Sequence, residues 1–358
     1  PFFLVEFIGE TAGHPICPRS RLKQVLLLAE EMGYEPRMAF EYEFFIFRES
    51  AQSVRDKNFQ GLIPLTPGNF GYSVLRTLSE SDLFNDFMDY CIDHGLDIEG
   101  LHCETGPGVW EAAIGVDGAL AAADKAALFK TFAKAFFQRR ELIATFMAKW
   151  SMDYPGQSGH LHQSLNAIDT SKNIFFDESD PQNMSDTMRF YVGGLQKHMK
   201  SFLAMTSPTV NSYTRLVRGA WAPTAATWGV ENRTAALRVI KGDTKSQRVE
   251  FRVGSADANP YLTAAANIAA GLDGINNKIE PEAPVEGNAY DLQDDLPERL
   301  QLSSNLRDAN YAFNRSAVAR QYLGDTFVDH FSASRDWEVR EYERSVNDWQ
   351  LKRYFEII

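Results

Sequence analysis

Three short segments of the sequence each carry two polar side chains, two residues apart, among apolar residues. These pairs are Glu41 and Glu43, His160 and His162, and Glu250 and Arg252. Side chains in a β-strand alternate between its two faces, so each pair should lie on one face, about 6.5 Å apart along the strand. An amphipathic strand can simply turn such a face to solvent. Three such pairs in one chain favour a shared concave site.

Hydrophobic spacing predicts further elements around these strands. We expect helices over residues 21–32, 80–94, 120–150 (one long helix or two), 184–204, 260–272 and 335–358. We expect strands over residues 2–8, 38–48, 96–104, 160–165 and 248–253, and a loop over residues 60–71. This mixed order predicts an α+β fold, in which helices back a curved antiparallel or mixed β-sheet.

Charge and composition exclude some classes of protein. The chain has 358 residues, enough for one large or two ordinary domains, and a net charge of -12. That charge argues against a general nucleic-acid or anionic-membrane binder. Three cysteines without metal-binding spacing, no bilayer-length apolar run and no visible signal peptide predict a cytoplasmic protein.

The segment from Arg215 to Arg252 differs from the rest of the chain. It contains eight basic and three acidic residues, a local charge of +5. Apolar residues are interleaved with the basic ones, which suggests partial burial. Because buried arginines need anionic partners, phosphate and carboxylate are the expected ligands.

Five carboxylates and one imidazole would converge if the polar-faced strands are neighbours. They are Glu41, Glu43, Glu104, Glu111, Glu250 and His160. Their repulsion and desolvation require compensating cations. Oxygen-dominated ligation favours Mg²⁺ or Mn²⁺, and hard cations beside arginines suggest phosphoryl transfer. The sequence has no GxxxxGK[ST] or GxGxxG motif, so ATP would have to bind in another way.

These residues fall in five ordered blocks that resemble the catalytic domain of the glutamine synthetase superfamily. The blocks are residues 40–45, 104–111, 159–164, 211–217 running on to 232–234, and 248–252 followed by 258–262. The resemblance extends through almost the whole chain. Within the superfamily the pattern is most similar to γ-glutamylputrescine synthetase and other γ-glutamyl-amine ligases.

The resemblance implies a role for each matching residue. Ligands of the metal nearest the amino acid would be Glu43, Glu104 and Glu111, and ligands of the metal at the ATP phosphates would be Glu41, His160 and Glu250. Nucleotide contacts would come from Glu99, His162, Ser164, Lys245 and Arg248. Glutamate would be held by Arg215 and Arg252, and the transferred phosphate by Arg233 and Arg238. We expect two or three Mg²⁺ or Mn²⁺ ions per site, with ATP as co-substrate.

The family reaction activates the glutamate γ-carboxylate as an acyl phosphate, which an amine then attacks. Two positions depart from the family pattern. Trp221 stands where ammonia-using members carry a glutamate that binds and deprotonates ammonium. The stretch Tyr154-Pro155-Gly156, with Gly156 the expected substrate contact, stands where the family usually offers an Asn-Gly pair to the amino acid, which leaves amino-acid specificity open.

Trp221 therefore favours a larger substrate, a primary amine or a polyamine such as putrescine. Trp221 could also be a packing substitution in an ammonia-using glutamine synthetase. A catalytically silent member with a binding or structural role and a two-metal amide hydrolase remain further alternatives.

The resemblance also implies a domain organisation and an assembly. The family has a smaller N-terminal β-grasp domain of about a hundred residues. We expect residues 1–15 to be the remnant of that domain and residues 16–358 to form the catalytic domain. With the N-terminal domain present, the implied assembly is a homo-oligomer of hexameric rings, possibly a dodecamer.

Overall fold

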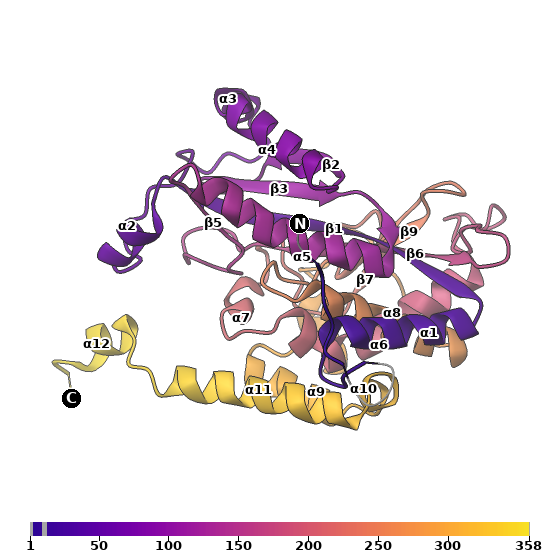
Figure 1. Cartoon of the computed structure of the whole chain (residues 1–358). Coiled ribbons are helices and arrows are strands. Elements are labelled where there is room, and N and C mark those ends of the chain that lie inside the picture. Colours follow the sequence, from indigo (N-terminus) through magenta and orange to yellow (C-terminus); the bar gives the residue numbers. More distant parts are fainter. Residues whose placement is uncertain (1–2, 9–12, 358) are drawn as a thin grey trace.

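The computed structural model describes residues 3–8 and 13–357, and a mixed β-sheet lies at its centre (Figure 1). The strands within the described residues are β1 (Tyr34–Phe47), β2 (Ile98–Cys103), β3 (Val109–Ile114), β4 (Asp117–Gly118), β5 (Ile143–Thr145), β6 (Gly159–Ala167), β7 (Trp228–Val230), β8 (Leu237–Ile240) and β9 (Arg248–Phe251). The spatial order is β2-β3-β1-β6-β9-β8-β7, and β4 and β5 pair with further stretches of β1. Only β7 and β8 run parallel among these pairs.

The alternation along β1 gives the sheet one apolar and one polar face. Phe40, Tyr42 and Phe44 are buried, while Glu41 and Glu43 are half-buried on the opposite side. Because side chains alternate along a strand, the aromatic rings pack into the core and the carboxylates share the other face.

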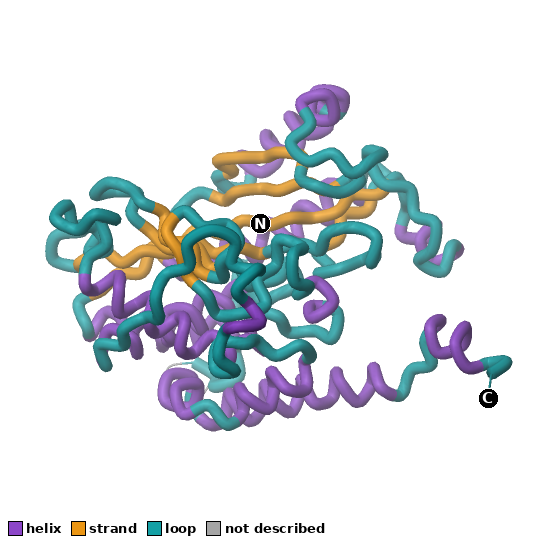
Figure 2. The backbone as a smooth tube through the Cα atoms, turned by 180° about the vertical axis from the view of Figure 1, so that it is seen from behind, coloured by secondary structure: helices purple, strands orange, loops and turns teal. Residues whose placement is uncertain are grey.

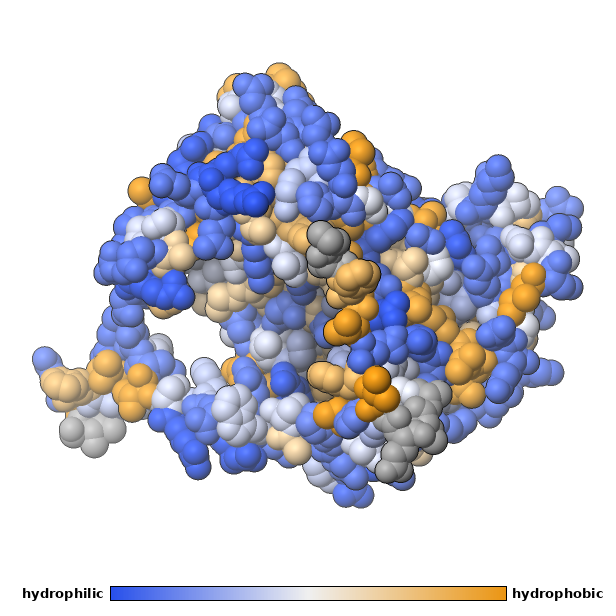
Figure 3. Space-filling model, viewed as in Figure 1, coloured by the Kyte–Doolittle hydropathy of each residue, from blue (hydrophilic) through white to orange (hydrophobic). Residues whose placement is uncertain are grey.

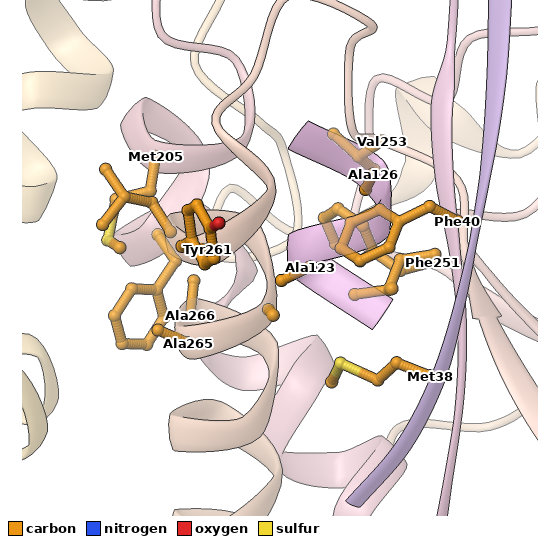
Figure 4. Close-up of a cluster of buried hydrophobic side chains, with 14 of the residues drawn as sticks. Met38, Phe40, Ala123, Ala126, Met205, Phe251, Val253, Tyr261, Ala265 and Ala266 are labelled. Atoms are coloured by element: carbon orange, nitrogen blue, oxygen red, sulfur yellow. The ribbon is translucent and has the colours of Figure 1, made fainter. Parts of the chain in front are cut away.

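Helices cover the apolar face of this sheet. The four that enclose the central core are α1 (Pro18–Glu31), α5 (Ala119–Gln138), α6 (Asp186–Thr206) and α8 (Pro260–Asn276). Figure 4 shows Met38 and Phe40 of β1 in one cluster with Ala123 and Ala126 of α5 and apolar residues of α8. In Figure 2, which views the molecule from behind, mainly loops cross the side away from α5.

The remaining helices extend around this centre. They are α2 (Ala51–Asp56), α3 (Val74–Ser79), α4 (Ser81–Asp93), α7 (Ser212–Arg215), α9 (Leu306–Asn314), α10 (Ala317–Leu323), α11 (Asp325–Glu343) and α12 (Asp348–Tyr354), with a 3₁₀ turn at Gln293–Asp295. The C-terminal α12 stands at the left edge of Figures 1 and 3, and its Trp349 and Leu351 are exposed. No helix within the described residues is long and apolar enough to cross a membrane.

Helices α6 and α8 approach closely because glycines face each other where they meet. A Cβ on Gly274 would lie 2.2 Å from the carbonyl oxygen of Phe190, and one on Gly194 would lie 2.1 Å from that of Ala270. Neither backbone can accept a side chain without moving away from the other helix. The glycines therefore set the spacing of the layer behind the sheet.

The structure confirms the predicted α+β class and corrects three local predictions. Residues 120–150 are not helical throughout, because α5 ends at Gln138 and β5 follows it. Glu141 has a φ of 57°, outside the helical range, and residues 143–145 pair with β1 instead. Residues 3–8 form no strand, and residue 2 of that prediction lies outside the described residues. The predicted helix at 335–358 is the end of α11 followed by a separate α12.

Candidate active site

A cavity of about 660 Å³ opens on the polar face of the sheet. Its walls come from β1, β2, β3, β6 and β9, together with loops around residues 155–158 and 220–222. All six predicted metal ligands line it, namely Glu41, Glu43, Glu104, Glu111, His160 and Glu250. The convergence expected from the two-residue spacing is therefore present.

Strand register brings these side chains together. Directly opposed residues are Glu41 and His160 on β1 and β6, Glu43 and Glu111 on β1 and β3, and His162 and Glu250 on β6 and β9. Opposed residues of paired strands point to the same face. A shift by one residue in any pairing would turn a whole set of ligands into the core.

One group of possible ligand atoms belongs to Glu41, His160 and Glu250, all within 4.8 Å of one another. Nδ1 of His160 lies 3.6 Å from Oε2 of Glu41 and 3.4 Å from Oε1 of Glu250. Its buried Nε2 makes no hydrogen bond to any residue that the structure describes. Burial disfavours ionisation of Glu250, but His160 and Arg252 outweigh it and lower the pKa of Glu250 to about 2. The carboxylate is thus held charged beside an imidazole.

A second group consists of His102, Glu104 and Glu111, again within 4.8 Å of one another. Nε2 of His102 lies 3.3 Å from Glu104 and 3.6 Å from Glu111. Burial and the neighbouring carboxylates, Glu43 first among them, raise the pKa of Glu111 to about 9. A carboxyl group that must take up a proton at neutral pH marks a site deficient in positive charge. Hard divalent cations fit this oxygen-rich donor set.

Basic side chains form the opposite wall of the cavity. Arg215 is 3% exposed and Arg252 is 5% exposed, and both line the cavity. Nη1 of Arg252 donates to Glu250, and Nη1 of Arg238 donates to the other Glu250 oxygen at 3.2 Å. Arg238 also donates through Nε to Glu231 at 3.1 Å. Two of these guanidinium groups thus contact Glu250 directly, and together they give the cavity positive charge that can attract an anion.

Gly156 leaves room for one of these arginines. A Cβ at this position would lie 2.6 Å from Cγ of Arg215 and 2.7 Å from the carbonyl oxygen of Ala148. Any side chain would therefore push the guanidinium out of its buried position.

Two aromatic side chains stand at the rim of the cavity in the left-handed backbone region. Trp221 has a φ of 57° and is 60% exposed, and Tyr72 has a φ of 56°. The Tyr72 ring stacks on His102 with 5.3 Å between centroids. Non-glycine residues rarely adopt this conformation, and the strain is often associated with function.

The catalytic-domain family of glutamine synthetase matches residues 15–354 of this chain. The chain belongs to this family. Type-1 glutamine synthetase 2 of Dictyostelium discoideum is 48% identical over 362 residues, covering 100% of this chain and 68% of that relative. Glutamate–isopropylamine ligase of a Pseudomonas species is 34% identical over 348 residues, covering 97% of this chain and 75% of that relative.

A solved structure has a similar fold. The structure of apo GmaS without ligand superimposes with a TM-score of 0.86 at 29% identity, covering 97% of this chain and 78% of that one. This member of the glutamine synthetase family is an ATP-dependent carbon–nitrogen ligase.

Four of the five residues that the family resemblance assigned to the nucleotide lie outside the cavity lining. They are Glu99, Ser164, Lys245 and Arg248. Of these, Arg248 reaches the cavity indirectly, because its Nε donates to Nδ1 of His162 at 3.1 Å. That bond places the proton of the neutral His162 ring on Nε2, which lies 3.0 Å from Oε1 of Glu41. The fifth residue, His162, does line the cavity.

Sequence reasoning missed two residues of this glutamine synthetase-family site. His102 lies two residues before Glu104 on β2, so the rule that paired the other ligands could have found it. Tyr72 lies in a loop thirty residues before its partner His102, and no spacing rule connects the two.

Proposed function

We propose that this enzyme joins the γ-carboxyl group of glutamate to a primary amine or polyamine, such as putrescine, through a γ-glutamyl phosphate. The observation that carries the proposal is Trp221, exposed at the rim of the acidic cavity. The resemblance expects a glutamate there in ammonia-using members. The relative named as a glutamate–isopropylamine ligase supports an organic amine.

Two sets of residues would hold divalent cations, most simply Mg²⁺ or Mn²⁺. Glu43, Glu104 and Glu111 would form one set, and Glu41, His160 and Glu250 the other. When bound, the cations would neutralise these carboxylates and polarise phosphate oxygens. The group around Glu111 supports this assignment, because its raised pKa reflects uncompensated negative charge.

The arginines would hold the two anionic substrates. Arg215 and Arg252 would bind glutamate carboxylate, with Gly156 keeping the Arg215 side of the pocket open. Arg233 and Arg238 would steady the phosphate in transfer. His162, Ser164, Lys245 and Arg248 would bind ATP along the β6 and β9 side, and Glu99 would contact it from β2.

The reaction then needs two substitutions. An oxygen of the glutamate γ-carboxylate attacks the γ-phosphorus of ATP, and ADP leaves with the electrons of the broken P–O bond. The neutral amine nitrogen attacks the acyl carbon, phosphate leaves, and the nitrogen loses a proton. Holding both reactants in one cavity lowers the entropic part of the barrier.

Trp221 suits an organic amine better than ammonium. The indole has no charge and cannot remove a proton from an ammonium ion. Its face can attract an alkylammonium group, and its apolar surface can cover the attached carbon chain. Aliphatic amines should therefore gain contacts that ammonium lacks.

An ammonia-using glutamine synthetase is the second candidate, because the 48% identical relative carries that name. The test is ADP release with ATP, Mg²⁺ and glutamate, in the presence of ammonium, methylamine, isopropylamine, putrescine or spermidine. We expect an organic amine to have a higher kcat/KM than ammonium. A clear preference for ammonium would replace the first proposal with the second.

Two variants test whether Trp221 determines the preference for an organic amine. Trp221→Ala should raise the KM for the preferred amine by about tenfold through loss of the aromatic contact, and leave the KM for ATP unchanged. Trp337→Ala is the matched control, because Trp337 is 55% exposed on α11 and does not line the cavity. Equal effects of both variants on the amine KM would count against the assigned role.

A further inference from the structure

The loop between β9 and α8 contains a carboxylate that accepts three side-chain hydroxyl hydrogen bonds. Oδ2 of Asp257 accepts from Oγ1 of Thr209 at 2.7 Å and from Oγ of Ser212 at 2.9 Å. Oδ1 accepts from Oγ of Ser255. The aspartate thus joins its own loop to the segment that begins α7.

The hydroxyl groups are oriented for a carboxylate in particular. Oγ1 of Thr209 accepts from the backbone N–H of Ser212 at 3.1 Å, and Oγ of Ser212 accepts from that of Thr209 at 3.1 Å. The two hydroxyl oxygens also lie 3.0 Å from each other, and both are within hydrogen-bonding distance of Oδ2, which can accept from each. If asparagine replaced Asp257, an NH₂ group in the place of Oδ2 would face two hydroxyl donors and accept from neither. An amide oxygen in that place could accept from both, but the NH₂ group in the place of Oδ1 could not accept from Ser255.

This link leads directly to the arginines of the active site. Ser212 is the first residue of α7 and Arg215 the last. The Arg215 guanidinium donates to the carbonyl oxygens of Val253 at 2.9 Å and Arg252 at 3.3 Å. The chain from Arg252 to Asp257 and the chain from Thr209 to Arg215 are therefore tied together at both ends.

A partly buried lysine fixes the same loop to the helix layer. Nζ of Lys130 on α5 donates to the carbonyl oxygens of Ala256 at 2.6 Å and Ala258 at 3.0 Å, on either side of Asp257. Burial lowers the pKa of Lys130 and of Arg215, and the charge of Asp257 opposes that shift at both. The aspartate consequently stabilises these two cations while it orders the backbone.

We propose that Asp257 is a positioning residue that sets the Arg215 guanidinium and the Arg252 backbone for the carboxylate of the amino-acid substrate. The inference rests on the proposed function, in which these arginines bind glutamate. Asp257 does not line the cavity. Its loss should weaken glutamate binding while the metal and nucleotide side of the site stays in place.

The experiment compares wild type, Asp257→Asn and Asp257→Ala with Asp273→Asn as a matched control. Asp273 is 7% exposed on α8, and its Oδ2 accepts from His198 at 2.7 Å, but it does not line the cavity. We expect Asp257→Ala to raise the KM for glutamate about tenfold or more, and Asp257→Asn to raise it less. The KM for ATP should change less than about twofold in both, and Asp273→Asn should change neither constant.

The outcomes separate this role from a purely structural one. A lower unfolding midpoint with an unchanged glutamate KM would overturn the inference, and so would equal increases in the KM values for glutamate and ATP. If Asp257→Ala does not fold, Asp257→Asn carries the test, because it retains the shape and one acceptor oxygen. Wild type without glutamate-dependent ATP turnover would instead overturn the proposed function, and this role with it.

Discussion

Neutralising Glu111, one carboxylate of the cavity, should increase the free energy of unfolding of the metal-free protein and should reduce the additional stability that divalent metal gives. Glu111→Gln keeps the shape of the side chain and removes its charge. Glu111 lies in a group in which its carboxylate oxygen and that of Glu104 are within 4.8 Å, with Glu43 opposite on the next strand. The substitution therefore relieves repulsion in the metal-free protein but removes a proposed metal ligand.

The geometry sets the size of the effect. Two unit charges 4.8 Å apart repel by about 3.5 kcal/mol at an effective dielectric constant of about 20. Proton uptake by Glu111 already relieves part of this, because its pKa is raised to about 9. We therefore expect Glu111→Gln to increase the free energy of unfolding by about 1–3 kcal/mol in excess EDTA at pH 8.

Divalent metal should stabilise the wild type by more than it stabilises Glu111→Gln. Binding at a hundredfold excess over Kd adds about 2.7 kcal/mol to the free energy of unfolding, and a tenfold loss of affinity removes about 1.4 kcal/mol of that gain. The assay is urea unfolding of both proteins with EDTA and with Mg²⁺ or Mn²⁺. Glu280→Gln, a surface position 58% exposed, is the control and should stay within about 0.5 kcal/mol of wild type in both buffers. Destabilisation of Glu111→Gln in EDTA, or an undiminished gain with metal, would refute the electrostatic reasoning.

Three further substitutions test stability and substrate binding. Lys57 and nearby donors lower the pKa of Glu49 to about 2, so the stabilising effect of its carboxylate is present above the unfolded-state pKa of about 4.5 and is lost as pH falls towards 2. Glu49→Gln should lower the free energy of unfolding by about 1–3 kcal/mol at pH 7 in urea unfolding. The difference from wild type should shrink below pH 4. Gly274→Ala should cost about 1–3 kcal/mol by overpacking α6 against α8, and a stabilised variant would contradict the crossing geometry. Gly156→Ala should raise the KM for glutamate about tenfold or more by displacing Arg215, and an unchanged KM would show that the backbone can move aside.

The sequence predicted the fold class and the convergence of the polar side chains. That convergence was predictable because strand alternation is rigid: once Glu41 and Glu43 share a face, antiparallel pairing aligns them with His160 and Glu111. The apolar residues on the opposite face indicated which side is buried. Local periodicity was sufficient for β1, β2, β6 and β9, but it did not predict β3, β7 or β8.

Periodicity failed where pairing between distant segments decided the conformation. The Ala-rich stretch after residue 120 continues to look helical, yet residues 143–145 add to the edge of β1 near Phe47. The hydrogen bonds gained there and the turn at Glu141 outweigh local helical propensity. Asp257 was invisible for a related reason, since its partners Thr209 and Ser212 lie more than forty residues away.

Glu250 links the arginines of the cavity to His160, one of its proposed metal ligands. Its two oxygens accept from Arg252 and Arg238, and one of them also lies 3.4 Å from His160. In the proposed function, lone pairs of Glu250 that coordinate a cation would no longer be available to the arginines, and their guanidinium groups would then be free to bind phosphate or carboxylate. By reciprocity, an anion that draws the arginines away would leave Glu250 a better metal ligand. Coupling of this kind would let one carboxylate hold the arginines in place before substrates arrive and release them when both kinds of ligand are present.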